Sequence, residues 1–121
     1  MNQRISGLLL APLLALAACS SSSDDSGGSS LQAPNLTDVL PMMGALHLMW
    51  ENKQTDCDAI EVERMSGSKA YEVVFSVPGS ADNKMDDGAT DTTAKYMYRL
   101  RCKKGAEYSS YSNEKSGTPT K

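Results

Sequence analysis

Tyr96-Met97-Tyr98-Arg99-Leu100-Arg101-Cys102 is the stretch of the chain that decides the fold. Its apolar positions, Tyr96, Tyr98, Leu100 and Cys102, alternate with Met97, Arg99 and Arg101. In an extended strand, successive residues point to opposite sides, so residues two apart share a side. A period of two therefore indicates that one side faces a core and the other faces solvent. The stretch therefore predicts a half-buried β-strand whose core side chains include Tyr96, Tyr98 and Leu100.

Three more segments on the N-terminal side of this strand show the same alternation. Their expected inward rows are Leu46, Leu48 and Trp50; Ile60 and Val62; and Tyr71, Val73, Phe75 and Val77. Turn-forming residues separate the segments, and no long segment has the 3.6-residue apolar period of a helix. The pattern predicts an all-β protein in which two sheets pack about 10 Å apart.

Six segments, in their order and spacing, resemble those of a fibronectin type III domain. They are residues 34–36, 46–50, 60–64, 86–88, 96–102 and 109–113. The resemblance implies an immunoglobulin-like β-sandwich of about seven strands over residues 34–119. It implies that Trp50 fills the core and that Tyr96 is the corner tyrosine, whose hydroxyl bonds to the backbone upstream. The chain lacks the usual proline before Tyr96, and residues 83–85 form a weak candidate strand that we expect to fray.

The N-terminus carries an export signal. A basic head at Arg4 and an apolar run over residues 5–16 precede Leu16-Ala17-Ala18-Cys19. This ending resembles the lipobox of bacterial lipoproteins, which implies a signal peptide over residues 1–18 and acylation of Cys19. The alternative is an ordinary cleaved signal with a chance cysteine after it. Ser20, in place of an aspartate, favours the outer membrane.

Residues 19–33 are rich in Ser, Gly and Asp, which predicts a disordered tether between the lipid and the domain. Removal of the leader takes Arg4 and leaves 11 basic against 15 acidic residues. A chain of this charge with no basic stripe is not expected to bind nucleic acid. The membrane is expected to be a partner only through the lipid on Cys19.

Cys57 and Cys102 are the two cysteines that remain once Cys19 is lipidated. An even pair in an exported protein usually forms a disulfide. The resemblance implies the same pairing, because it sets the start of one strand beside the end of its antiparallel neighbour. Strict alternation would turn Cys57 the wrong way, so an irregular step near Asp58 is needed. The same register would place Glu61 beside Arg99 as an exposed ion pair with no functional role.

No catalytic, metal or cofactor-binding residues are predicted. His47, the only histidine, lies on the outward phase of its strand, away from any evident nucleophile. Carboxylate and amide side chains crowd one loop region, but their spacing does not fit an EF-hand calcium loop and suits turns better. They are Asp82, Asn83, Asp86, Asp87 and Asp91. Cys57 with Asp56 and Asp58 lacks the partners of a zinc site.

Exposed apolar side chains are the remaining indication of function. Seven of them exceed what a core of this size can hold: Met42, Met43, Met49, Met65, Met97, Tyr108 and Tyr111. Methionine and tyrosine favour adaptable contact surfaces, although scattered apolar residues are also normal on protein surfaces. We therefore expect a lipid-anchored, non-catalytic module that binds an envelope protein or a polysaccharide. The alternative is a structural or accessory subunit of an envelope assembly with no ligand of its own.

Overall fold

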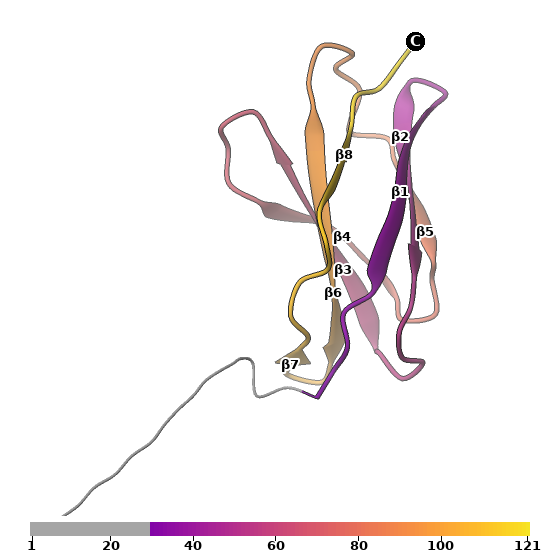
Figure 1. Ribbon diagram of the computed structural model, residues 1–121, viewed down its shortest axis with the longest axis vertical. Coiled ribbons are helices and arrows are strands. Elements are labelled where there is room, and N and C mark those ends of the chain that lie inside the picture. The colour runs from indigo at the N-terminus through magenta and orange to yellow at the C-terminus, as the bar shows by residue number, and fades with distance from the viewer. Residues whose placement is uncertain (1–29) are drawn as a thin grey trace, which may run out of the picture.

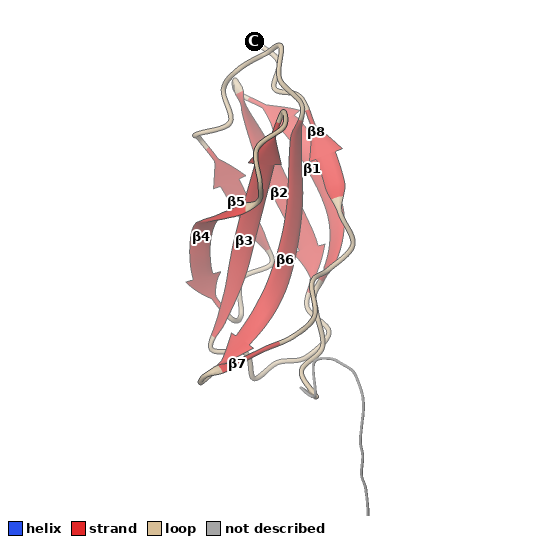
Figure 2. Cartoon of the chain, turned by 90° about the vertical axis from the view of Figure 1, so that its left-hand side faces the viewer, coloured by secondary structure: helices blue, strands red, loops and turns tan. Residues whose placement is uncertain are grey.

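The computed structural model describes residues 30–121, so the predictions for the signal peptide, Cys19 and the first part of the tether lie outside it. The described residues form eight strands and no helix (Figure 2). The strands are β1 (Asn35–Met42), β2 (Ala45–Glu51), β3 (Ala59–Ser66), β4 (Glu72–Pro78), β5 (Asn83–Asp86), β6 (Tyr96–Lys104), β7 (Glu107–Tyr108) and β8 (Lys115–Gly117). Within residues 30–121, no helical segment has the length and apolarity that crossing a membrane requires.

Two antiparallel sheets face each other as a sandwich (Figure 1). One sheet has the order β1-β2-β5, and the other has the order β4-β3-β6-β7 with β8 also paired to β6. The expected core side chains are buried: Trp50 is 4% exposed, Tyr96 8%, and Tyr98 and Leu100 0%. The all-β sandwich predicted from the alternating segments is confirmed.

The disulfide between Cys57 and Cys102 joins the segment before β3 to the end of β6, with 5.7 Å between the two Cα atoms. The irregular step expected near Asp58 is present, because the Asp58 N–H donates to Lys103 O and the regular β3–β6 ladder starts one residue later. Gly79 packs on this step: a Cβ there would lie 1.8 Å from the Cys57 carbonyl oxygen. In the chain-entropy model, a bridge across 45 residues stabilises the fold by about 4 kcal/mol.

The predicted inward row on β4 is wrong at Val73, which is 50% exposed. The β3–β4 register shifts between Val62 and Glu63, where the partner sequence skips from Phe75 to Val73. A β-bulge reverses the phase of a strand, so Val74 packs against the core in the place of Val73. Simple alternation cannot anticipate such an extra residue.

The strand expected to fray is instead paired. β5 forms a four-residue ladder with β2, from Leu46–Asp86 to Met49–Asn83. The last strand, by contrast, is less regular than expected, since residues 109–114 contain no strand. Serine hydroxyls replace its ladder acceptors there: Ser109 Oγ accepts from Cys102 N and Ser112 Oγ from Leu100 N.

The domain begins before residue 34. Leu31 packs against the hydrophobic core, and the Gln32 N–H donates to Gln54 Oε1. The tether expected over residues 19–33 therefore does not extend to its predicted end, because an apolar residue can bury its side chain once the sandwich has formed. Leu31 lies with Asp56 and Lys104 at the same end of the sandwich as the disulfide.

Candidate binding face

The outward face of the five-stranded sheet gathers most of the polar and apolar side chains that could form a site. Across β3 and β6, successive outward pairs are Glu61–Arg101, Glu63–Arg99 and Met65–Met97. The predicted pairing of Glu61 with Arg99 is wrong, since Glu61 lies opposite Arg101, two residues further along β6. The residues are also less exposed than expected, because tyrosines from other segments cover them.

Glu63 is the most buried member of this face, at 5% exposed. Its Oε1 accepts from Nε and Nη2 of Arg99, both at 2.8 Å. Its Oε2 accepts from the Tyr111 hydroxyl at 2.8 Å. Glu61 holds Arg101 in the same way, with Nε at 3.1 Å and Nη2 at 3.0 Å. Each carboxylate fixes the plane of one guanidinium group.

Three tyrosine rings stack on these two guanidinium groups. Arg99 Cζ lies 4.0 Å from the centre of the Tyr71 ring and 3.6 Å from that of Tyr111. Arg101 Cζ lies 3.8 Å from the Tyr108 ring and 5.0 Å from Tyr111. The order Tyr71, Arg99, Tyr111, Arg101, Tyr108 is here called the tyrosine–arginine ladder. Each such contact contributes about 0.5–1 kcal/mol at an exposed site, so the ladder holds its side chains in place.

The phenols of Tyr71 and Tyr111 stay protonated at neutral pH. Burial raises the pKa of Tyr71 to about 12, and the nearby Glu114 carboxylate acts in the same direction. Burial also raises the pKa of Tyr111, and donation to Glu63 adds to the rise. The Tyr71 hydroxyl is buried near the Glu114 carboxylate. The face therefore offers tyrosine rings and guanidinium groups that are already paired.

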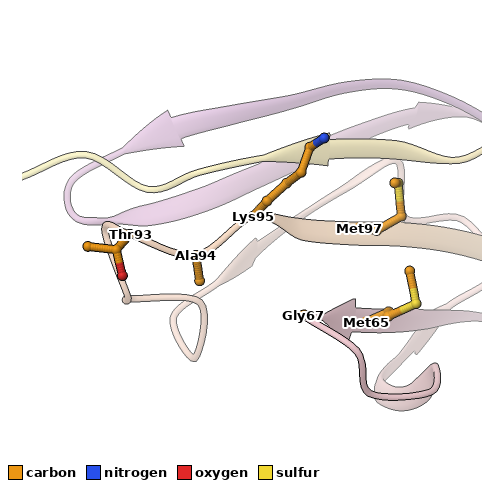
Figure 3. Close-up of a pocket in the computed structure, with 6 residues that line it drawn as sticks. All are labelled: Met65, Gly67, Thr93, Ala94, Lys95 and Met97. Carbon is orange, nitrogen blue, oxygen red and sulfur yellow. The ribbon is translucent and has the colours of Figure 1, made fainter.

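An apolar pocket of about 380 Å³ continues this face beyond the ladder (Figure 3). Met65 and Met97, the next outward pair after Glu63 and Arg99, form one side of it. Gly67 and residues 93–95 complete the lining. We refer to the ladder and this pocket together as the binding face.

Asp86, which the sequence assigned to a turn, is a buried link between the sheets. It is 0% exposed on β5 and accepts from Arg64 Nη1 of β3 at 2.8 and 3.0 Å. Its carboxylate also accepts from the Tyr98 hydroxyl at 2.6 Å and from the Gly88 N–H at 2.9 Å. Burial raises the pKa of Tyr98, and donation to Asp86 adds to this rise. We call Arg64, Asp86 and Tyr98 the inter-sheet clasp.

Two of the other predicted positions, His47 and Met43, lie away from the binding face. His47 is on the outward side of the other sheet, with Nε2 3.2 Å from Asn83 Oδ1. The Tyr96 hydroxyl accepts from the Asp91 N–H at 3.3 Å, the upstream contact expected of a corner tyrosine. Of the predicted surface apolar residues, Met43 is the most exposed, at 93%, and Tyr108 and Tyr111 are 36% and 37% exposed.

Sequence reasoning missed the ladder because its three tyrosines come from three separate segments. Tyr71 precedes β4, Tyr108 is in β7 and Tyr111 follows it in an irregular stretch. The usable signal was the presence of two outward arginines, Arg99 and Arg101, on a strand that is followed closely by two tyrosines, Tyr108 and Tyr111. Aromatic rings are the surfaces on which guanidinium groups stack.

No protein-family model and no curated protein matches the chain. Solved structures do. Part of a β-1,2-glucanase from Parabacteroides distasonis is similar with a TM-score of 0.67 and 18% identity, over 79% of this chain and 13% of that one. The FN1–FN3 domains of chicken CNTN1 are similar with a TM-score of 0.64 and 13% identity, over 87% of this chain and 34% of that one.

The fn3 domain of the human collagen alpha-1(XX) chain is also similar, with a TM-score of 0.53 and 21% identity over 83% of this chain and 89% of that one. The chain thus spans about an eighth of the glucanase and most of the collagen domain. At these identities the likeness concerns the fold alone. The fold is that of a fibronectin type III domain.

Proposed function

We propose that the protein is a lipid-anchored lipoprotein of the bacterial outer membrane whose sandwich is a non-catalytic module that binds an envelope protein. The observation that carries the binding role is the continuity of the tyrosine–arginine ladder with the methionine-lined pocket on one face. The lipobox ending at Cys19, followed by Ser20, supports the anchor and its destination.

The ladder suits recognition because its side chains are already ordered. Binding costs less when rotamer-rich side chains such as arginine are held before the partner arrives. Glu63 and Tyr111 hold Arg99 from two sides, and the exposed tyrosine edges supply the aromatic surface that is common at interfaces. The adjacent Met65 and Met97 form an adaptable apolar floor.

A protein partner fits this face better than a polysaccharide. Sugars bind aromatic side chains mainly through the ring face, and the Tyr111 ring is already in contact with two guanidinium groups, those of Arg99 and Arg101. What remains accessible is ring edges and an apolar pocket. That combination fits a protein segment with an apolar side chain flanked by polar backbone groups.

The placement of the pocket agrees with an anchored module. The N-terminal segment joins the sandwich at the disulfide end, where Leu31 packs (Figure 1). The pocket lies at the other end of β3 and β6, beside Ser66 and Tyr96. A domain tethered through Cys19 would therefore present the pocket away from its own membrane.

A photo-crosslinking amino acid at Met97 in intact cells tests the binding role. The matched control carries it at Glu51, which is exposed on the other sheet. We expect one discrete crosslinked protein from position 97 and none from position 51. Crosslinking from both positions to one stoichiometric partner would instead indicate a structural subunit, and capture of glycan alone would replace the protein partner with a polysaccharide.

The anchor is tested separately with Cys19→Ser. We expect the unmodified chain to incorporate labelled fatty acid and to remain in the membrane fraction, and the variant to do neither. A chain that fractionates identically with and without Cys19 would contradict the anchor, without affecting the result obtained at Met97.

A further inference from the structure

The outward face of the three-stranded sheet carries the only histidine of the sequence next to two methionines. β2 and β5 pair with His47 directly opposite Met85 and with Met49 opposite Asn83. Cross-strand partners point to the same side of a sheet, as do residues two apart on one strand. Since Leu46 and Leu48 are buried inward, His47, Met49 and Met85 share the outward side. We call these three residues the histidine–methionine cluster.

The spacing of the cluster lets three donor atoms converge. Directly opposed residues have Cβ atoms about 4.5–5.5 Å apart, and diagonal neighbours are about 7–8 Å apart. His47 and Met85 are directly opposed, and Met49 and Met85 are diagonal neighbours. Methionine has three rotatable bonds, so both thioether sulfurs can reach an ion held by the imidazole.

A hydrogen bond orients the imidazole for such a role. His47 Nε2 lies 3.2 Å from Asn83 Oδ1, and Asn83 Nδ2 donates to Asp82 Oδ1. Because the amide nitrogen is committed to Asp82, the oxygen faces the ring and can only accept. The ring proton therefore sits on Nε2, and Nδ1 keeps its lone pair for a ligand. Metal-binding histidines are commonly oriented through their second nitrogen in this way.

The donor set is that of a soft metal. Thioether sulfur selects Cu(I), and imidazole also suits copper. Hard and borderline ions require other ligands, and within residues 30–121 no three His, Cys, Asp or Glu side chains come together as a metal-binding group. Asp38, which lies opposite Met49 on β1, adds a negative charge that favours a cation.

We infer that the histidine–methionine cluster binds Cu(I), through His47 Nδ1 and the sulfurs of Met49 and Met85. The ion binds and leaves as Cu(I), so no electron is transferred. The inference does not depend on the proposed function, because the cluster lies on the sheet opposite the binding face. If the cluster does not bind Cu(I), the proposed binding function is unaffected, and the reverse also holds.

Silver(I), a redox-inert probe of the same ligand preference, tests the site. The full chain with Cys19→Ser removes the only cysteine outside the disulfide, and methyl-labelled methionine reports each sulfur by NMR. We expect saturation at one equivalent of silver nitrate, with shifts confined to the methyl groups of Met49 and Met85. Cu(I) kept reduced by ascorbate should produce the same pattern.

The variants decide whether the cluster is the site. His47→Ala and, separately, Met85→Leu should each weaken binding by at least about tenfold. Met43→Leu is the matched control, since Met43 is 93% exposed and outside the cluster, and it should titrate like the parent chain. Equal shifts at all methionine methyl groups, or unchanged affinity in well-folded His47→Ala, would overturn the inference.

Discussion

The inter-sheet clasp and the tyrosine–arginine ladder use the same three chemical groups at different depths. In the clasp, Asp86 is fully buried and holds Arg64 and Tyr98 between the two sheets. In the ladder, Glu63 holds Arg99 and Tyr111 on the outside of one sheet. The guanidinium group is partly exposed in both, so the surroundings of the carboxylate make the difference.

The comparison teaches that an ion pair stabilises a fold in proportion to what would be left unpaired if it were broken. A carboxylate with no access to water, such as that of Asp86, cannot replace a lost partner with solvent, whereas Glu63, whose side chain keeps 7% exposure, can do so in part. The clasp therefore fixes how the sheets are aligned. The ladder fixes the shape of a surface, which is what a binding site requires.

Removal of Asp86 should have the largest effect. Asp86→Ala leaves Arg64 and the Tyr98 hydroxyl without their shared acceptor, which typically costs about 3–5 kcal/mol of unfolding free energy. Asp87→Ala, in the same turn but exposed, is the control and should stay within about 0.5 kcal/mol of the parent chain. Urea unfolding followed by circular dichroism measures both. Equal losses would mean that the clasp contributes no more than a surface turn.

Glu63→Gln should have an intermediate effect. The amide retains part of the hydrogen bonding but loses the charge opposite Arg99, for a loss of about 1–3 kcal/mol. Glu61→Gln, whose side chain is 13% exposed against 7% for Glu63, should lose less. The same urea titration ranks the two. A larger loss for Glu61 would reverse the assignment of Glu63 as the centre of the ladder.

High pH should weaken both clusters, and the clasp more. The folded-state pKa of Tyr71 is raised to about 12 from the ordinary value of 10.0. Its contribution is therefore fully present below pH 10 and is lost as the pH rises toward 12. The pKa of Tyr98 is raised further by its deeper burial. Between pH 9 and 12.5, which passes the folded-state pKa of Tyr71, Tyr98→Phe should flatten the fall in stability more than Tyr71→Phe does; the opposite order would contradict the comparison.

Arg101→Lys should have the smallest effect. Lysine keeps the charge near Glu61 but loses the flat group that stacks on Tyr108 and Tyr111, which is worth about 0.5–1 kcal/mol. Arg99→Lys is the variant to compare with it, because Arg99 lies close to two rings and pairs with the more buried carboxylate, that of Glu63. Thermal unfolding of the two variants should show the greater loss at Arg99. Identical melting would argue against the ladder as an ordered unit.

The sequence predicted what depends on neighbouring residues along the chain. Alternation over residues 96–102 identified every buried side chain of β6, because the pleat of a strand is a local property. Register is not local. The bulge at Val62 exposed Val73, and the partner of Glu61 turned out to be Arg101 and not Arg99.

The two clusters were beyond sequence reasoning for the same physical reason. Aspartate is a residue type that is common in turns, and only the contacts of Asp86 with Arg64 and Tyr98 of the opposite sheet explain its burial. Tyr111 follows no alternating pattern, so its place between two arginines depends on how the irregular segment lies on β6. Both are products of tertiary structure.

The chain's single tryptophan offers a convenient optical reporter. Trp50 is 4% exposed, and its indole N–H donates to the Ala81 carbonyl oxygen at 2.9 Å. Its fluorescence emission should shift to longer wavelength when water enters the core. Because neither the ladder nor the pocket includes Trp50, ligand capture at that face should leave the emission unchanged. One spectrum can thus separate loss of folding from loss of binding.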